Sequence, residues 1–238
     1  MKAVSSKSKK INKDNIPEFI YLIPGNWFEL KNMIPERLQP YDSDMLKEEI
    51  LNQVNNRAEK LDVFNTKFCR MYQNAEVESI TFHLDKNKFD QIAKILTKER
   101  RHPIITFHGT KPDVIDSILK NGYIMPGDKT SPTKISVAHG SMYGTGIYSS
   151  SFFDKASCYT VADANAYVYI LINILFPGKA ILIPPHTMTN ITLSQPTNGR
   201  YPDGTNTRIV YGLDQVISAD PARIVPVGVM KIKAFNKV

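Results

Sequence analysis

The amino-acid sequence predicts an α+β fold, with helices in the first part of the chain and a mainly β second part. Beyond about residue 166, runs rich in β-branched and aromatic residues are separated by proline and glycine, which is typical of strands and turns. Helical periodicity is confined to earlier residues. Because helices and strands do not alternate regularly along the chain, the sequence excludes a doubly wound parallel sheet.

The composition indicates one domain of ordinary size with an accessory segment. The chain has 238 residues, of which 42% are hydrophobic, and this suits a core domain of roughly 150 residues plus an extension. The best candidate for a membrane span, residues 168–176, contains Asn173 and stops at Pro177. It is shorter than the roughly 18 residues that a span needs, so we expect a soluble protein without a membrane partner.

The cysteines and the N-terminus both predict an intracellular protein, cytoplasmic or nuclear. Cys69 and Cys158 are the two cysteines, and neither has a Cys or His nearby at zinc-ligand spacing. We therefore expect neither a disulfide framework nor a metal site. No apolar stretch follows the first lysines, so no secretory signal peptide is predicted.

The N-terminal part of the chain differs in composition from the rest and predicts three regions. Residues 1–14 hold five lysines of a chain whose formal net charge is +7, and we interpret them as a disordered basic leader. Such a leader is either merely solvated, or an arm for nucleic acid or acidic surfaces, or a nuclear address. Residues 15–74 are expected to form an accessory helical segment, with an amphipathic helix over residues 43–61. Residues 75–238 form the third region, the main domain.

The elements of the main domain follow from its apolar spacing and its turn residues. A strand at residues 80–82 precedes a helix whose apolar face ends at Leu96, and a second strand at residues 103–107 delivers His108 at its end. A helix over residues 112–121 has Pro112 in its first turn and Gly122 as its stop. Residues 125–141 lack periodicity and are long for a passive connection, so we interpret them as a lid or binding loop. The later strands are predicted at residues 168–175, 180–183, 190–193, 207–211, 215–218 and 223–232.

Two separated glycine motifs indicate a ligand pocket. Residues 107–110 read Phe-His-Gly-Thr and residues 143–149 read Tyr-Gly-Thr-Gly-Ile-Tyr-Ser. Glycine lets the backbone approach a ligand closely, and the neighbouring His108 and Tyr148 can hydrogen-bond a ribose. Each residue alone has a structural explanation, as a strand-end histidine, a core tyrosine or a turn glycine. Their combination predicts a pocket for a nucleotide such as NAD.

From about residue 78 to the C-terminus, the chain resembles the catalytic domain of the poly(ADP-ribose) polymerase family, the diphtheria-toxin-like class of ADP-ribosyltransferases. The motifs that carry the resemblance are residues 107–110, 117–123 (SILKNGY), 143–148 (YGTGIY), Tyr159, 176–179 (FPGK) and 222–226 (ARIVP). The resemblance implies split mixed or antiparallel β-sheets with flanking helices. It also implies that NAD is the substrate and that no metal is needed.

The resemblance assigns a role to each matching residue. His108 would hydrogen-bond the nicotinamide ribose, and the backbone of Gly109 would hold the carboxamide. Tyr148 and Tyr159 would sandwich the nicotinamide ring, whose positive charge suits aromatic faces. Such a pocket fixes the ring and docks the ribose while oxocarbenium character develops on the sugar. The implied NAD-binding residues are His108, Gly109, Thr110, Tyr148, Ala156, Ser157 and Tyr159.

Two positions depart from the family pattern. Eight residues after Tyr148, where many members have a serine against the carboxamide, this chain has Ala156, with Ser157 next to it. At the position of the catalytic glutamate it has Gln215. A glutamine can hydrogen-bond a ribose hydroxyl, but it carries no charge to stabilise an oxocarbenium ion and cannot act as a base. His108, Tyr148 and Gln215 are therefore the predicted catalytic residues of an enzyme that transfers single ADP-ribose units to a protein or nucleic-acid acceptor.

Two other functions remain open from the sequence. One is a catalytically weak or inactive binding module that keeps the NAD pocket, which the missing glutamate favours. The other is an RNA 2'-phosphotransferase-like enzyme, whose family also has a His-Gly-Thr stretch in a related fold. The intact segment at residues 143–148 and the absence of that family's distributed arginines argue against the second.

Overall fold

The computed structural model describes residues 74–96, 98, 103–127, 142–151, 153–183, 195–210 and 215–235. Several predictions from the sequence lie outside these ranges. They concern the leader at residues 1–14, nearly all of the accessory segment, the helix at residues 43–61, most of the loop at 125–141 and the strand at 190–193.

The described residues form an eight-stranded mixed sheet with short helices, which confirms the predicted α+β class. The elements are β1 (Asn74–Phe82), α4 (Lys86–Leu96), β2 (Ile104–Gly109), η1 (Pro112–Val114), α5 (Ile115–Asn121), β3 (Ile147–Ser150), α6 (Phe153–Ser157), β4 (Tyr167–Leu175), β5 (Ala180–Ile183), β6 (Thr207–Val210), β7 (Gln215–Ser218), η2 (Pro221–Arg223) and β8 (Ile224–Phe235). The strand order is β1-β8-β4-β2-β3-β7-β6-β5. Between these strands β5 and β6 pair in parallel, and every other neighbouring pair is antiparallel.

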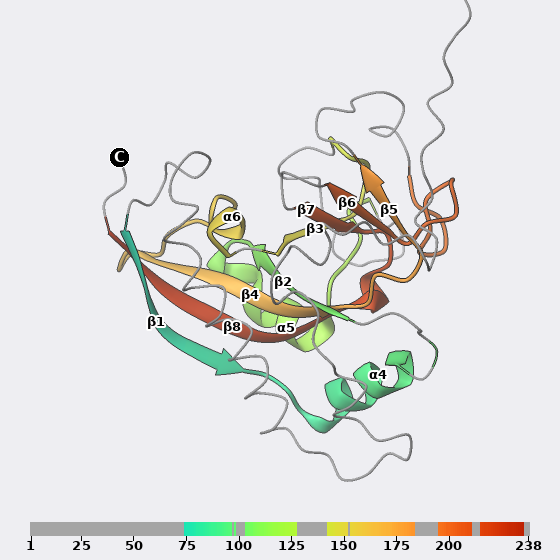
Figure 1. The fold of residues 1–238 in the computed structure, drawn as a ribbon. Coiled ribbons are helices and arrows are strands. Elements are labelled where there is room, and N and C mark those ends of the chain that lie inside the picture. The colour runs from blue at the N-terminus through green and yellow to red at the C-terminus, as the bar shows by residue number, and fades with distance from the viewer. Residues whose placement is uncertain are drawn as a thin grey trace, which may run out of the picture.

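The sheet has two halves of four strands that meet at a narrow junction. One half is β1, β8, β4 and β2, and the other is β3, β7, β6 and β5 (Figure 1). β2 and β3 pair at one position, Phe107 opposite Ser150, whereas β2 pairs with β4 at every residue from Ile104 to Gly109. The expected split is thus a narrow junction within one connected sheet.

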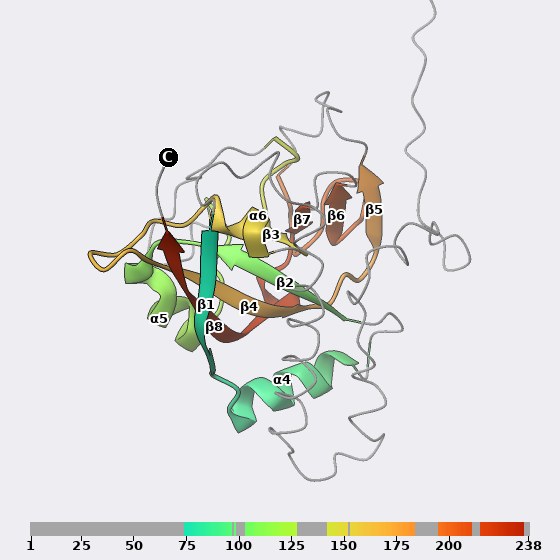
Figure 2. The same cartoon turned by 60° about the vertical axis from the view of Figure 1, so that its left-hand side comes forward.

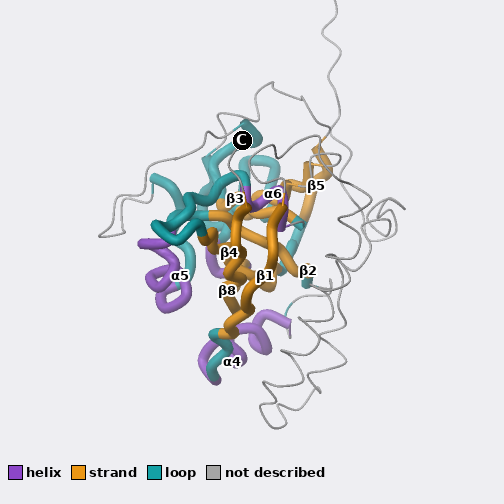
Figure 3. Tube along the Cα trace, turned by 90° about the vertical axis from the view of Figure 1, so that its left-hand side faces the viewer, coloured by secondary structure: helices purple, strands orange, loops and turns teal. Residues whose placement is uncertain are grey.

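Apolar helix faces cover both sides of the first half. Leu119 of α5 packs with Leu171 and Leu175 of β4 on one face. Phe89 and Ile92 of α4 and Ala156 of α6 pack on the other face against Phe107 of β2. Figures 2 and 3 show α5 on one side of this half and α6 on the other. Since β4 is covered on both faces, its sequence is almost continuously apolar instead of alternating.

Several element boundaries differ from those predicted. β1 has nine residues, because its pairing with β8 begins at Asn74, well before Ile80 and Phe82, from which the strand was predicted. The helix α6 was not predicted, since five residues are too few to display a helical period. β2 extends through Gly109, so His108 lies within the strand. The stop at Gly122 is confirmed, with φ of 78° and its N–H bonded to the carbonyl of Ile118 at 2.9 Å.

Cys158 corrects one prediction. It is disulfide-bonded, whereas the sequence led us to expect no disulfide framework. Spacing in the sequence does not report which cysteines meet in space.

In the part of the chain that the structure describes, no helix is long and apolar enough to cross a membrane.

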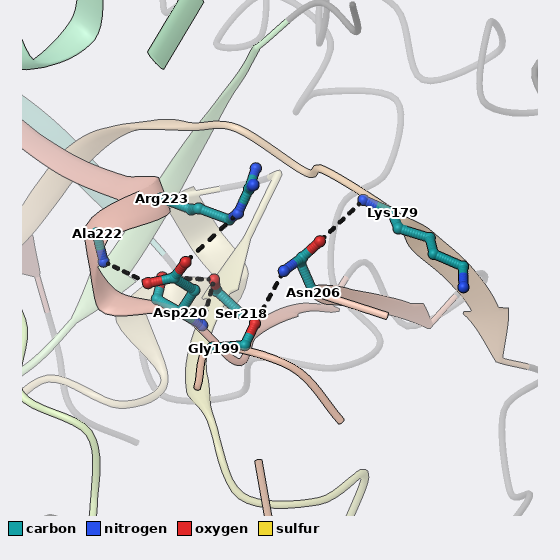
Figure 4. Close-up of polar contacts among 7 residues, drawn as sticks. All are labelled: Lys179, Gly199, Asn206, Ser218, Asp220, Ala222 and Arg223. Carbon is teal, nitrogen blue, oxygen red and sulfur yellow. Dashed lines mark hydrogen bonds and ion pairs between the residues drawn. The ribbon is translucent and has the colours of Figure 1, made fainter. Parts of the chain in front are cut away.

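The turn between β7 and β8 is fixed by the carboxylate of Asp220. One oxygen accepts the backbone N–H of Ala222 at 3.0 Å, and the other lies 3.4 Å from Nε of Arg223. The hydroxyl of Ser218 donates to the carbonyl of Asp220 at 3.0 Å (Figure 4). These contacts cap η2 and set the path of the chain from one half of the sheet back into the other.

The Phe-Pro-Gly-Lys turn before β5 packs against this same region. The side-chain oxygen of Asn206 accepts the N–H of Lys179 at 3.2 Å, and its nitrogen donates to the carbonyl of Gly199 at 2.9 Å (Figure 4). Gly178 has φ of 55°, and a Cβ there would lie 2.7 Å from Nη1 of Arg223. The positive φ favours glycine at that position, and any other residue would also displace the end of the Arg223 side chain.

Candidate active site

The predicted site residues lie around the junction between the two halves. His108 and Gly109 come from β2, Tyr148 from β3 and Gln215 from the first position of β7. α6 follows β3 in the chain and packs on β2, so it connects the halves across the junction. The structure therefore places residues from four separate elements around one junction.

His108 is held by a hydrogen bond from its Nδ1 to the backbone carbonyl of Tyr148, at 2.6 Å. A carbonyl oxygen can only accept, so Nδ1 carries the proton and the lone pair is on Nε2. Burial lowers the pKa of His108, and the hydrogen bond to Tyr148 opposes this more weakly. The neutral imidazole that results can accept a hydrogen bond from a ribose hydroxyl through Nε2.

Gly109 lies directly beneath the carbonyl of Ala156 in α6. A Cβ at this position would overlap that carbonyl oxygen and would lie 2.9 Å from its carbon. It would also lie 3.0 Å from Cγ2 of Thr160, just beyond the helix. Because the main obstacle is backbone that cannot rotate away, only glycine allows α6 to approach β2 this closely.

The hydroxyl of Tyr148 is anchored in the turn of its own motif. It donates to the carbonyl of Gly144 at 2.8 Å and accepts the N–H of Tyr143 at 3.0 Å. Burial raises the pKa of Tyr148 to about 12, so the phenol stays protonated and keeps donating. The turn at residues 143–148 thus fixes the orientation of the tyrosine ring.

Tyr159 and Gln215 contact one another from different elements. The side-chain nitrogen of Gln215 donates to the hydroxyl of Tyr159 at 3.4 Å, and the tyrosine is 36% exposed. Gln215 pairs with Ser150 at the start of β7, two positions along β3 from Tyr148. The predicted catalytic amide and the second predicted ring-stacking tyrosine are therefore neighbours.

The other predicted pocket residues belong to the same region but differ in exposure. The methyl group of Ala156 packs in the apolar core with Phe107, while Ser157 is buried and its carbonyl accepts the hydroxyl of Thr160 at 2.7 Å. Thr110 directly follows β2 and is half-buried. Ala156 thus contributes mainly its backbone to the junction.

Two buried polar residues behind His108 were not predicted as part of the site. Tyr123 packs the edge of its ring against that of His108, with centroids 5.1 Å apart and an angle of 80° between the planes. Its hydroxyl donates to the side-chain oxygen of Asn173 at 2.8 Å. The signal available in the sequence was Asn173 itself, a polar residue inside the apolar run of β4.

A cavity of about 420 Å³ lies elsewhere, at the junction of β1, α4 and α5. Its polar lining combines Asp85, Asp116, Lys88 and Lys120, so opposite charges largely balance. The carboxylate of Asp85 also accepts the N–H of Lys88 at 2.9 Å at the start of α4. None of the predicted site residues lines this cavity.

Comparison with known families identifies the scaffold on which these residues lie. The poly(ADP-ribose) polymerase catalytic domain matches residues 49–199, more than half of the chain, so the chain belongs to this family. One relative is the poly [ADP-ribose] polymerase tankyrase of Caenorhabditis elegans, 31% identical over 114 residues. That match covers 44% of this chain and 5% of the tankyrase. The family match ends before Gln215.

Proposed function

We propose that this chain is an NAD⁺-dependent mono-ADP-ribosyltransferase, which cleaves the nicotinamide–ribose bond and transfers ADP-ribose to a macromolecule. Membership of the family supports NAD⁺ as the substrate. The contact between Gln215 and Tyr159 carries the proposal of single-unit transfer, because it sets a neutral amide beside a tyrosine predicted to stack on nicotinamide.

In this proposal the nicotinamide ring lies between Tyr148 and Tyr159, and its carboxamide is held by the backbone of Gly109 with Ser157 nearby. The anchored hydroxyl of Tyr148 supports this, because a stacking ring is useful when its orientation is fixed beforehand. The unprotonated Nε2 of His108 accepts a hydrogen bond from a hydroxyl of the nicotinamide ribose, and Thr110 lines the pocket beyond it.

The reaction begins when the bond between the ribose carbon and the nicotinamide nitrogen breaks, and the electron pair leaves with nicotinamide. The ring becomes neutral and the ribose acquires oxocarbenium character. A nucleophilic atom of the acceptor then attacks that carbon and loses its proton to water. Gln215 orients a ribose hydroxyl, but it cannot take that proton or activate a hydroxyl for elongation. Products therefore carry one unit.

Substitution of Gln215 tests the proposal. With wild-type protein we expect nicotinamide release and products bearing single ADP-ribose units. Gln215→Glu should release nicotinamide about tenfold faster, because a carboxylate stabilises the developing positive charge, and this gain needs only about 1.4 kcal/mol. Gln215→Ala should be slower than wild type. Gln195→Glu is the matched control, since Gln195 is exposed and outside the site.

Three results would overturn all or part of this assignment. Polymer made by the wild-type protein would refute single-unit transfer. Equal rates for wild type, Gln215→Glu and Gln215→Ala would place Gln215 outside the site. An absence of nicotinamide release from all variants, with NAD still bound, would instead support a binding module, the second candidate that the neutral amide favours.

The acceptor class is tested with labelled NAD and a cell lysate, followed by protease or nuclease digestion of the products. Label released by protease identifies a protein acceptor, and label released by nuclease identifies a nucleic acid. We propose that residues 75–238 form the body of the catalytic domain and that residues 15–74 are an accessory segment, of which the part from residue 49 lies within the family match. We also propose that residues 1–14 are a dispensable leader and that the protein acts inside cells. Deleting residues 1–14 should leave nicotinamide release unchanged.

A further inference from the structure

A buried polar cluster lies directly behind His108, on the face of the sheet that α5 covers. Tyr123 contacts the histidine ring edge-on and donates its hydroxyl to Asn173. Both residues are buried, Asn173 completely. Thr106, also completely buried, is the strand partner of Asn173 in the β2–β4 ladder, two residues before His108. The cluster therefore begins at the predicted catalytic histidine and extends into the core.

The fold brings this cluster together by two local devices. Gly122 ends α5 with a positive φ and turns the chain, so that Tyr123 leads back onto the sheet. Asn173 shares its face of β4 with Leu171 and Leu175, which pack beneath α5. An apolar residue at 173 would fit that pattern better than an amide does.

Burying these polar groups is unfavourable, so the cluster demands an explanation beyond packing. In the described part of the chain, the side-chain nitrogen of Asn173 and the hydroxyl of Thr106 have no hydrogen-bond partner. A phenylalanine and a leucine would fill a similar volume without desolvating polar atoms. The polar pair does one thing that an apolar pair cannot, because a hydrogen bond at the hydroxyl fixes where the ring of Tyr123 lies.

We propose that Tyr123 and Asn173 are positioning residues that hold the imidazole of His108 in the orientation used by the reaction. The proposal rests on the proposed function. The carbonyl of Tyr148 fixes Nδ1 of the histidine, and the ring of Tyr123 limits the swing of the imidazole about that bond. Nε2 is thereby directed before NAD arrives, and no reorganisation is needed as charge develops.

The experiment compares Tyr123→Phe with the double variant Tyr123→Phe/Asn173→Leu. The first keeps the ring but leaves the Asn173 oxygen without its donor. The second removes both polar partners, which restores much of the lost stability. We expect kcat for nicotinamide release to fall about tenfold in both variants, with KM for NAD changed less than threefold. Tyr169→Phe is the control. Tyr169 lies on β4 like Asn173, and this substitution removes a hydroxyl that donates to the carboxylate of Asp163 at 2.9 Å.

Recovery of wild-type kcat in the stabilised double variant would overturn the proposal, since the pair would then act only through stability. A second measurement, NMR of the imidazole nitrogens of His108, is independent of activity. Wild type should show the Nδ1–H tautomer, and Tyr123→Phe should show tautomers averaged by exchange. If these spectra are obtained with a protein that releases no nicotinamide, the proposed function is refuted, but the positioning role of Tyr123 and Asn173 stands. An unchanged spectrum in Tyr123→Phe would refute the pair alone.

Discussion

Gly109→Ala tests the close contact on which the arrangement of the site depends. The added methyl group would overlap the carbonyl oxygen of Ala156 and crowd Cγ2 of Thr160. No side-chain rotation in β2 or α6 relieves the overlap with Ala156, because the overlapped atoms belong to the backbone. α6 must therefore move away from β2, and it carries Ser157 and Tyr159 with it.

The magnitude follows from the nature of the overlap. Forcing an extra methyl group into a packed site costs roughly 1 to 3 kcal/mol, and a clash with backbone belongs at the upper end of that range. For a protein of this size, about 3 kcal/mol corresponds to a fall in Tm of roughly 6 to 12 °C. Displacement of Tyr159 should also weaken NAD binding, in protein that is still folded at the assay temperature.

The assay pairs thermal unfolding with calorimetric titration of NAD, and Gly228→Ala is the control. Gly228 lies on β8, where a Cβ would meet the carbonyl oxygen of Thr81 at 3.0 Å and Cδ1 of Phe82 at 3.2 Å. This substitution should lower Tm by a few degrees, since about 1 kcal/mol corresponds to roughly 2 to 4 °C, and should leave NAD affinity unchanged. If Gly109→Ala binds NAD as tightly as wild type, α6 does not position the pocket and the reasoning fails.

Two further predictions concern pH and the turn before β8. Burial lowers the pKa of His108 below its ordinary value near 6.5, so the contribution of the neutral ring to stability is complete above that pH and is lost as the pH falls below it. Tm should drop more between pH 7 and pH 5 for wild type than for His108→Gln, and parallel curves would contradict this. Asp220→Ala removes the cap of η2 and the contact with Arg223. It should lower the free energy of unfolding by about 1 kcal/mol without altering kcat for nicotinamide release. A large loss of kcat would place this turn in the site.

Most strands and helices of the main domain were predictable because they have a strong local signal, whereas β3 and α6 were not predicted. Gly122 stops α5 as expected, and the bounds of β5 and β7 agree with the prediction. α6 is too short to show a helical period, and its contact with Gly109 joins residues that lie far apart in the sequence. The meeting of Tyr159 with Gln215 likewise depends on strand pairing that no short window of sequence contains.

Tyr123 and Asn173 show a different limit of sequence reasoning. Each has an ordinary explanation by itself, as a residue after a helix stop and as an interruption of an apolar strand. Only the register of the sheet and the path of the chain after α5 bring the two side chains together. A lone polar residue in a strand buried on both faces is the signal that would have led to them.

Under the proposed function, the single pair between Phe107 and Ser150 gives the junction of the sheet a role in holding the ligand. In a continuous ladder, the peptide N–H and C=O groups of neighbouring strands hydrogen-bond to one another. Here β3 pairs with β2 at Phe107 alone, while His108 and Gly109 pair only with β4. A flat amide such as a carboxamide has a donor and an acceptor like a peptide, and it could hydrogen-bond to the edge of β2 that β3 leaves unpaired. The molecule bound at the junction would then act as a short piece of strand, linking the two halves of the sheet.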